Sequence, residues 1–285
     1  MAFDHTRASL NGARSFVWIL VLVVLSACAS GPKRPPVGTL EPDKFLFERG
    51  TEELNKKHWL TAREYFRQLN DSYPQSSYRA DAKLGLADTY LGEGSAESNV
   101  LAVNEYREFL SFYPTHRRAY YAQFKLGMCH FYQMHGPDRD QSETQEAITE
   151  LSTFIERYGN SDLGDPHRAK VIAEGRTRLR EARDRLSDAN YRVAYFYLRT
   201  QKYAPAAIDR FRAILKSDPE YSRRDAVYFY LAEALLKMNQ SAEAVPLLDR
   251  LIMEFESSEY LEQTRKLLET LRADVKKTGS VSHES

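Results

Sequence analysis

Residues 50–74 read GTEELNKKHWLTAREYFRQLNDSYP, and this stretch decides the fold. Five of its residues follow one another at intervals of 12, 4, 3 and 5: Gly50, Ala62, Phe66, Leu69 and Pro74. Two antiparallel helices approach closely only where one offers Gly or Ala and the other fills the gap with a ring. A proline then ends the second helix and sets the turn into the next element. The stretch therefore predicts a hairpin of two packed helices.

The same spacing recurs, with variations, in four more places. The second copy has five extra residues around positions 92–95 and contains Gly85, Ala102, Tyr106, Phe109 and Pro114. The third has eight extra residues around positions 136–138 and contains Gly127, Ala147, Leu151, Phe154 and Gly159. The fourth has Tyr195 at the small position, followed by Ala207, Phe211, Ile214 and Pro219. The fifth lacks the final proline and contains Ala232, Ala244, Leu248 and Leu251. Five copies in register resemble the tetratricopeptide repeat.

The body is therefore predicted to be an all-α tetratricopeptide-repeat solenoid of about five helix hairpins. No segment alternates apolar and polar residues cleanly over the length of a strand. Residues 166–199 contain no obvious helix breaker except Gly175, so we expect one long helix that belongs to both halves of the array. Residues 258–277 form a last amphipathic helix suited to capping the open end of the array. The apolar positions of this helix are Leu261, Leu267, Leu268 and Leu271.

The predicted organisation has an N-terminal half and a C-terminal half. We expect three repeats in residues 43–165, the long helix with the last repeats and the cap in residues 166–277, and a disordered tail in residues 278–285. The middle of the long helix, residues 176–185, mixes arginines with acidic residues. This pattern is typical of a solvated helix face with ion pairs, and the alternative is a basic stripe for an acidic partner.

The first 27 residues have the features of a secretory signal peptide. Two arginines precede the apolar run of residues 16–25, which is too short to span a bilayer and ends at Leu-Ser-Ala before Cys28. This placement of Cys28 resembles a bacterial lipobox, which implies cleavage before Cys28 and lipid attachment to it. The alternative is an ordinary signal peptide cut near Ala27 or Ala29. By analogy with enteric lipoproteins, Ala29 after the cysteine favours an outer-membrane anchor with the protein facing the periplasm.

Residues 28–42 are expected to form a tether, because their four prolines and two glycines prevent a helix. The whole chain carries 40 basic and 40 acidic residues, and this balance argues against nucleic acid as a partner. If Cys28 carries lipid, Cys129 is single and cannot form an internal disulfide. Its apolar neighbours predict a small buried core residue.

Sequence motifs for catalysis or metal binding are missing. The chain contains no Walker loop, GxSxG elbow, HExxH or paired CxxC. His130 and His135 are five residues apart and would not share a helix face as metal ligands four apart do. We therefore expect no enzyme activity, no metal and no cofactor.

Binding is the better interpretation of the repeats. In a tetratricopeptide array the first helix of each repeat lines a groove, and aromatic and Met side chains there suit an extended or helical peptide. The candidates for this peptide groove are Phe47, Tyr121, Phe124, Met128 and Phe131. Phe229 holds the comparable position in the fifth repeat. The alternative is that these side chains pack against the next helix as core.

These features together resemble the BamD family, the lipoproteins of the β-barrel assembly machinery. The most similar stretches are residues 182–198, with Asp-Arg-Leu and Val-Ala-Tyr-Phe-Tyr, and residues 203–211 before Asp218-Pro219. The resemblance implies a non-catalytic periplasmic scaffold at the outer membrane. Its C-terminal repeats would dock a BamA-like barrel insertase, with Arg210 at the contact, and its N-terminal repeats would receive unfolded outer-membrane proteins.

Three alternatives stay open beside this resemblance. Arg210 is equally suited to a surface ion pair with a neighbouring carboxylate. The chain could be another tetratricopeptide lipoprotein, such as a secretin pilotin or an adaptor for cell-wall enzymes. An envelope enzyme with a helical accessory body would need a catalytic cluster, which the sequence does not contain.

Overall fold

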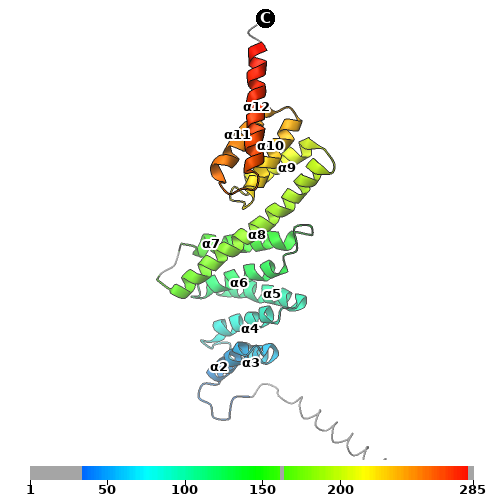
Figure 1. Cartoon of the computed structure of the whole chain (residues 1–285). Helices are drawn as coiled ribbons and strands as arrows, with labels where there is room; N and C mark the ends of the chain where they lie inside the picture. The colour runs from blue at the N-terminus through cyan, green and yellow to red at the C-terminus, as the bar shows by residue number, and fades with distance from the viewer. Residues whose placement is uncertain (1–33, 161–163, 282–285) are drawn as a thin grey trace, which may run out of the picture. The chain divides into compact units, whose positions relative to one another are not determined.

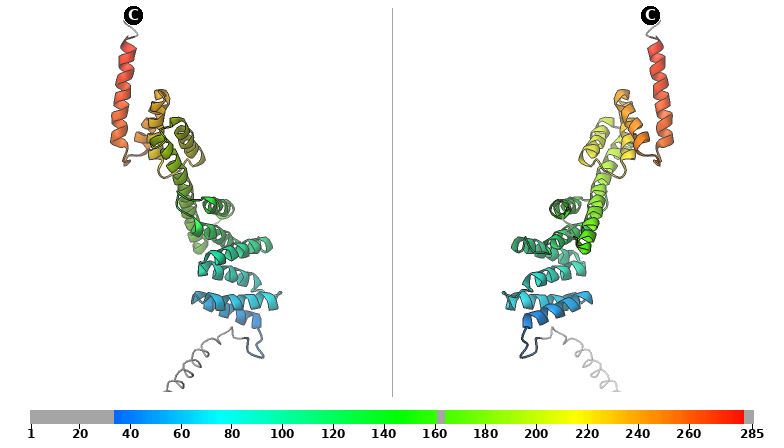
Figure 2. Two further views of the ribbon diagram at one scale, coloured as in Figure 1. Left: turned by 90° about the vertical axis from the view of Figure 1, so that its right-hand side faces the viewer. Right: turned by 90° about the vertical axis from the view of Figure 1, so that its left-hand side faces the viewer.

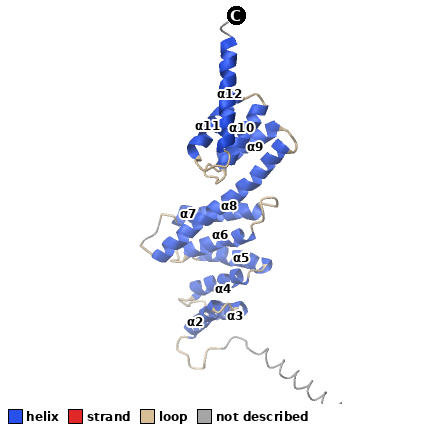
Figure 3. Ribbon diagram, viewed as in Figure 1, coloured by secondary structure: helices blue, strands red, loops and turns tan. Residues whose placement is uncertain are grey.

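The regular secondary structure in the computed structural model is entirely helical over its described residues, 34–160 and 164–281 (Figures 1 and 3). The helices are α2 (Pro42–Asn55), α3 (Trp59–Ser72), α4 (Arg79–Glu93), α5 (Ala96–Phe112), α6 (Ala119–Gln133), α7 (Ser142–Tyr158), α8 (Pro166–Arg199), α9 (Ala204–Ser217), α10 (Arg224–Lys237), α11 (Ser241–Glu254) and α12 (Leu261–Val281). The predicted signal peptide, the predicted lipidation site Cys28 and residues 282–285 lie outside the described residues.

The helices belong to two compact units. The first unit ends at Pro114 and contains α2 to α5, and the second begins at Thr115 and contains α6 to α12. The division predicted between residues 165 and 166 falls inside the second unit, just before α8, and stays a prediction.

The first hairpin, α2 and α3, packs as its spacing predicts. Ala62 and Leu69 are fully buried, and Phe66 lies against two glycines. A Cβ atom added at Gly50 would lie 2.7 Å from the Phe66 ring, and one added at Gly85 of α4 would lie 2.5 Å from it. Both distances are shorter than any side chain tolerates without displacing its neighbour, so glycine is required at both positions.

The second hairpin, α4 and α5, uses its extra residues to lengthen the helices. The two helices contain 15 and 17 residues and are joined by only two residues. Gly94 ends α4 in the left-handed conformation at φ 76°, which a glycine adopts without strain. Ser95 then begins α5, because its side chain accepts a hydrogen bond from the backbone N–H of Ser98.

The third hairpin, α6 and α7, opens the second unit. Its small residue, Gly127, faces Leu151. The connection at positions 134–141 is five residues longer than in the first hairpin, and the other three extra residues lengthen the helices. The long helix α8 has the bounds that the sequence predicts. Asp165 caps its first turn by accepting hydrogen bonds from the backbone N–H groups of residues 167 and 168, and Pro166 occupies the first helical position.

One residue on α8 differs from the predicted register. Tyr195 was expected at the small position of the fourth repeat, but it is 37% exposed, and Ala194 is fully buried in the core that contains Phe211. The connection to α9 is one residue longer than in the first hairpin, so the small residue moves back by one position. Gly175, on the first half of α8, lies against the ring of Phe154 from α7.

The fifth hairpin and the last helix complete the second unit. Ala232, Ala244, Leu248 and Leu251 are all fully buried, as predicted. Helix α12 packs Leu268 into the same core and runs on past α11 (Figure 2). It begins three residues later than expected and continues to Val281, because residues 278–281 include no proline that would stop it.

Candidate functional site

Two of the predicted groove residues belong to the core of the second unit. Phe124 and Met128 of α6 are 4% and 1% exposed. The Phe124 ring lies 5.5 Å from the ring of Phe154, and α7 and α8 both pack on α6. The structure therefore shows these two side chains packed in the core and not lining a groove.

Tyr121 and Phe131 lie at the edge of the same core and are half-buried. Two cations face the Tyr121 ring, with the guanidinium carbon of Arg118 at 4.8 Å and the ammonium of Lys125 at 5.4 Å from its centre. Arg178 of α8 lies 5.4 Å from the centre of the Phe131 ring. Such cation–π contacts are attractive and help to fix the orientation of each ring.

Phe47, the remaining groove candidate, belongs to the first unit. It is half-buried and stacks on Tyr78, with the ring centres 5.2 Å apart and the planes at 21°. The structure therefore brings Tyr121 and Phe131 to one unit and places Phe47 in the other. Phe229, the equivalent position in the fifth repeat, is buried and stacks on Tyr260 at 4.9 Å.

Arg210 is exposed on α9, as a contact residue must be. Its guanidinium carbon lies 5.5 Å from the centre of the Tyr197 ring on α8. Within the described part of the chain, no carboxylate lies within ion-pair distance of Arg210, so the structure does not support the surface ion pair. The planar guanidinium keeps its donors available for a partner.

The arginine-rich segment of α8 is largely ion-paired. Arg178 bonds Glu181 at 3.0 Å, which fits the solvated-face interpretation of residues 176–185. Arg180 reaches out of its own helix to the buried carboxylate of Asp218 at 2.5 Å, and Ser187 donates to the same carboxylate at 2.7 Å. Burial is the largest single influence and would lower the pKa of Arg180, but the hydrogen bonds and charges of Asp218 and Asp184 together outweigh it, and the pKa is raised. The segment therefore fastens α8 to the turn after α9.

Tyr221, which lies in the same turn, makes a second contact with α8. Its hydroxyl donates a hydrogen bond to Asp188 of α8. Burial raises the pKa of the Tyr221 hydroxyl, and the carboxylate of Asp188 raises it further, so the group stays protonated and donates. The position of α8 is thus fixed by buried polar contacts as well as by apolar packing.

The buried Cys129 and His130 do not belong to a cluster of metal-ligating side chains in the described residues. Cys129 is buried, as its apolar neighbours predict. His130 is also buried and has its Nδ1 atom 2.8 Å from Glu143. Over residues 34–160 and 164–281, no group of three or more metal-ligating side chains comes together.

Comparison with protein families decides the relationship of this chain. The model of the family described as "YfiO: Outer membrane lipoprotein" matches residues 40–248. The chain belongs to this family. The match spans all five hairpins up to Leu248 in α11, so it rests on the same residues that form the repeats.

Two curated relatives carry the name that the sequence resemblance suggests. The outer membrane protein assembly factor BamD of Caulobacter vibrioides is 28% identical over 79% of this chain and 70% of its own length. The protein of the same name from Vibrio cholerae is 26% identical over 71% of this chain and 82% of its own. The resemblance to the BamD family is confirmed.

The chain also has distant similarity to solved structures. A tetratricopeptide repeat protein from Parabacteroides merdae has 13% identity and a TM-score of 0.34, covering 81% of this chain and 87% of its own. The TPR2AB domain of yeast Sti1 has 11% identity and a TM-score of 0.33, covering 79% and 96%. The prediction of an all-α repeat fold is confirmed by the hairpins themselves.

None of the helices in the described ranges combines the length and apolar character needed to cross a bilayer.

Proposed function

We propose that the protein is a non-catalytic assembly factor for outer-membrane proteins. The observation that carries this proposal is the family match over residues 40–248, together with relatives that are named outer membrane protein assembly factors. In this function the protein is anchored to the outer membrane through lipid on Cys28 and faces the periplasm. It would bind a BamA-like barrel insertase and unfolded outer-membrane proteins, and it would transfer the unfolded proteins to the insertase.

The insertase contact in this proposal is centred on Arg210. The exposed guanidinium lies on α9 with no carboxylate partner in the described part of the chain, and Tyr197 orients it. A guanidinium can bond a carboxylate through two parallel hydrogen bonds, which makes the contact directional as well as attractive.

The substrate contact is assigned to half-buried rings. Phe47 in the first unit and Tyr121 and Phe131 in the second present part of each ring to solvent. Phe124 and Met128, being buried, support the helix from inside and do not touch a substrate. Several weak apolar contacts suit a partner that is bound only transiently, because no single contact then dominates release.

Two experiments test the proposal in order. The full-length protein is purified in gentle detergent from its own membranes, and the recovered proteins are identified by mass spectrometry. A barrel protein with repeated periplasmic domains is the expected result. Recovery of a secretin or of cell-wall enzymes without that barrel protein would overturn the assembly function.

Charge reversal then tests the insertase contact. Arg210→Glu is expected to weaken binding of the insertase about tenfold or more, because a like charge replaces the attracting one. The thermal midpoint should not change, because the side chain is exposed. Arg157→Glu on α7, which is also exposed and without an ion pair in the described residues, is the matched control. Equal recovery of the insertase by both variants would exclude Arg210 as the contact.

A further inference from the structure

The second half of α8 exposes an apolar strip that its own unit does not cover. Ala189, Val193 and Phe196 are spaced i, i+4 and i+7, so they lie on one face of the helix. Val193 is 39% and Phe196 46% exposed. The buried side chains of this half of the helix, such as Ala194 and Leu198, occupy a different face, where α9 and α10 pack.

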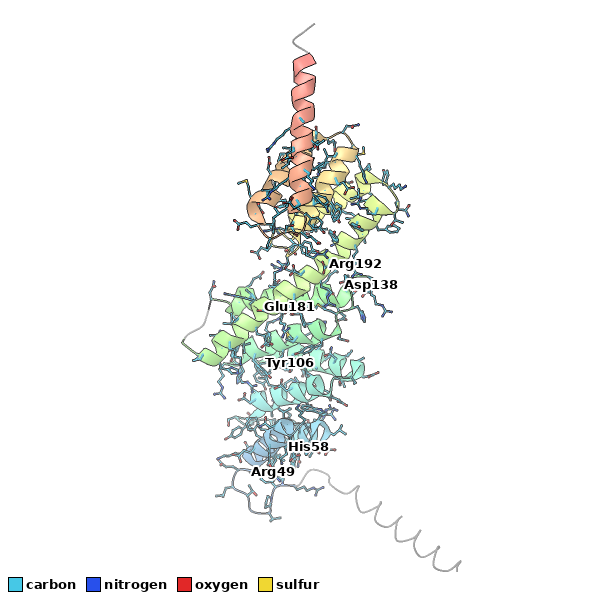
Figure 4. All side chains as sticks on the ribbon, viewed as in Figure 1. Arg49, His58, Tyr106, Asp138, Glu181 and Arg192 are labelled. Atoms are coloured by element: carbon cyan, nitrogen blue, oxygen red, sulfur yellow. The ribbon has the colours of Figure 1, made fainter. Side chains whose placement is uncertain are left out.

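The connection between α6 and α7 forms a wall beside this strip. Residues 134–141 contain five of the eight extra residues of the third repeat, and part of this connection lines a groove of about 410 Å³ together with α8. Its lining side chains on the wall are Pro137, Asp138, Arg139 and Gln141. Figure 4 labels Asp138 on the wall and Arg192 on α8, at the two sides of the groove.

The wall is held in place by hydrogen bonds. Arg185 of α8 donates to the backbone carbonyl of His135 at 2.9 Å. The side-chain amide of Gln141 donates to the carbonyls of Gly136 at 2.8 Å and Arg139 at 2.9 Å. These bonds tie the connection to α8 and to itself, so the groove exists before any partner arrives and little ordering entropy is lost on binding.

The rim of the groove carries unneutralised positive charge. Arg139 and Arg192 are exposed and have no carboxylate within ion-pair distance in the described ranges, and Asp138 is the one acidic side chain of the lining. This differs from many other arginines of the same unit, which are paired with Asp or Glu: Arg178, Arg180, Arg199, Arg212, Arg223, Arg224 and Arg250. The local excess of cations favours an acidic partner.

The groove lies close to the contact proposed at Arg210. The Arg210 guanidinium covers the Tyr197 ring, and the Tyr197 and Phe196 ring centres are 6.1 Å apart. A partner that bonds Arg210 therefore has the exposed strip of α8 as its next neighbour. An aromatic anchor point beside several arginines is the composition that dominates binding energy at protein interfaces.

We propose that this groove binds an acidic segment of the protein partner that docks at Arg210. The segment inserts an apolar side chain between Phe196 and Pro137 and places carboxylates against Arg139 and Arg192. This inference rests on the proposed function, in which the partner is the periplasmic part of a barrel insertase. The extra residues of the third repeat then serve as a recognition element of this chain.

The test measures binding of the full chain, in mild detergent, to the purified periplasmic fragment of the insertase encoded in the same genome. Isothermal titration calorimetry is carried out at two salt concentrations. Phe196→Ser is expected to raise Kd about tenfold, because it removes the apolar anchor point. The double variant Arg139→Glu and Arg192→Glu should raise Kd by a similar factor and reduce its dependence on salt.

The controls are chosen to match these changes in chemistry. Phe112→Ser removes an exposed Phe of the first unit, and Arg157→Glu reverses an exposed arginine of α7. Arg157 lies at the end of α7 that is far from the groove. The carbonyl of the nearby Gly159 accepts a hydrogen bond from Arg176, and Arg176 lies about 24 Å along α8 from Arg192 at 1.5 Å per residue. Both controls should bind like the unchanged chain, and thermal melts should show that every variant is folded at the temperature of the titration.

The outcomes separate this inference from the function on which it rests. If the unchanged chain does not bind the fragment, the proposed function fails, and the groove assignment fails with it. If the unchanged chain binds and Arg210→Glu weakens it, while the groove variants bind within twofold of the controls, the groove assignment fails and the proposed function stands. Weakening by the groove variants and not by their controls supports the assignment.

Discussion

Helix α6 and the second half of α8 carry similar apolar side chains but use them in opposite ways. On α6, Phe124 and Met128 are buried because α7 and α8 both pack over the helix. On α8, Val193 and Phe196 remain exposed because α9 and α10 cover a different face. An aromatic-rich helix therefore predicts a binding surface only where no later helix of its unit reaches it.

The largest expected loss of stability follows from a mutation in α6. Phe124→Ala should lower the free energy of unfolding by about 3–5 kcal/mol, because it leaves a cavity next to Phe154. Urea unfolding followed by circular dichroism measures this change. A loss below about 1 kcal/mol would place Phe124 on a surface and remove the contrast between the two helices.

An intermediate loss of stability is expected from a mutation in the first half of α8, where α8 packs over Phe154 of α7. Gly175→Ala gains about 1 kcal/mol of helix propensity, but the new methyl group collides with the fully buried Phe154 ring. Overpacking of this kind costs about 1–3 kcal/mol, so we expect a net loss of stability. Lys170→Ala, an exposed change on the same helix, is the control for propensity. A gain in thermal midpoint by the Gly175 variant would show that the ring moves freely.

The smallest effect on stability is expected from the exposed strip. Phe196→Ser should lower the free energy of unfolding by no more than about 1 kcal/mol, because nearly half of the residue is exposed. The same urea experiment, run beside Phe124→Ala, gives the direct contrast between two phenylalanines. A loss above about 2 kcal/mol would mean that Phe196 contributes to the core and is not a docking surface.

The sequence predicted the hairpins because their signal is local and strict. The intervals between the small residue, the alanine and the ring follow from how closely two helices can pack, so Gly50, Ala62 and Phe66 identify a hairpin without any knowledge of its neighbours. The extent of α8 was predictable because residues 166–199 contain no helix breaker except Gly175, and Asp165 and Pro166 fix its first turn in the structure.

What the sequence did not predict depends on contacts between distant elements. The role of Gly175 is set by Phe154 on another helix, and the burial of Phe124 and Met128 is set by how α7 and α8 cover α6. The small position of the fourth repeat was wrong by one residue, since a connection longer by one residue leaves no local signal. The sequence therefore located apolar helix faces, but their neighbours decide whether they are core or surface.

The position of Phe66 between two glycines bears on how the first unit loses its structure. Its ring contacts Gly50 in one hairpin and Gly85 in the next, so a single side chain couples the two repeats. Repeat arrays behave as chains of units linked by nearest-neighbour interfaces, and a strong interface makes adjacent units melt together. Amide hydrogen exchange in α2 and α4 should therefore report one shared opening event.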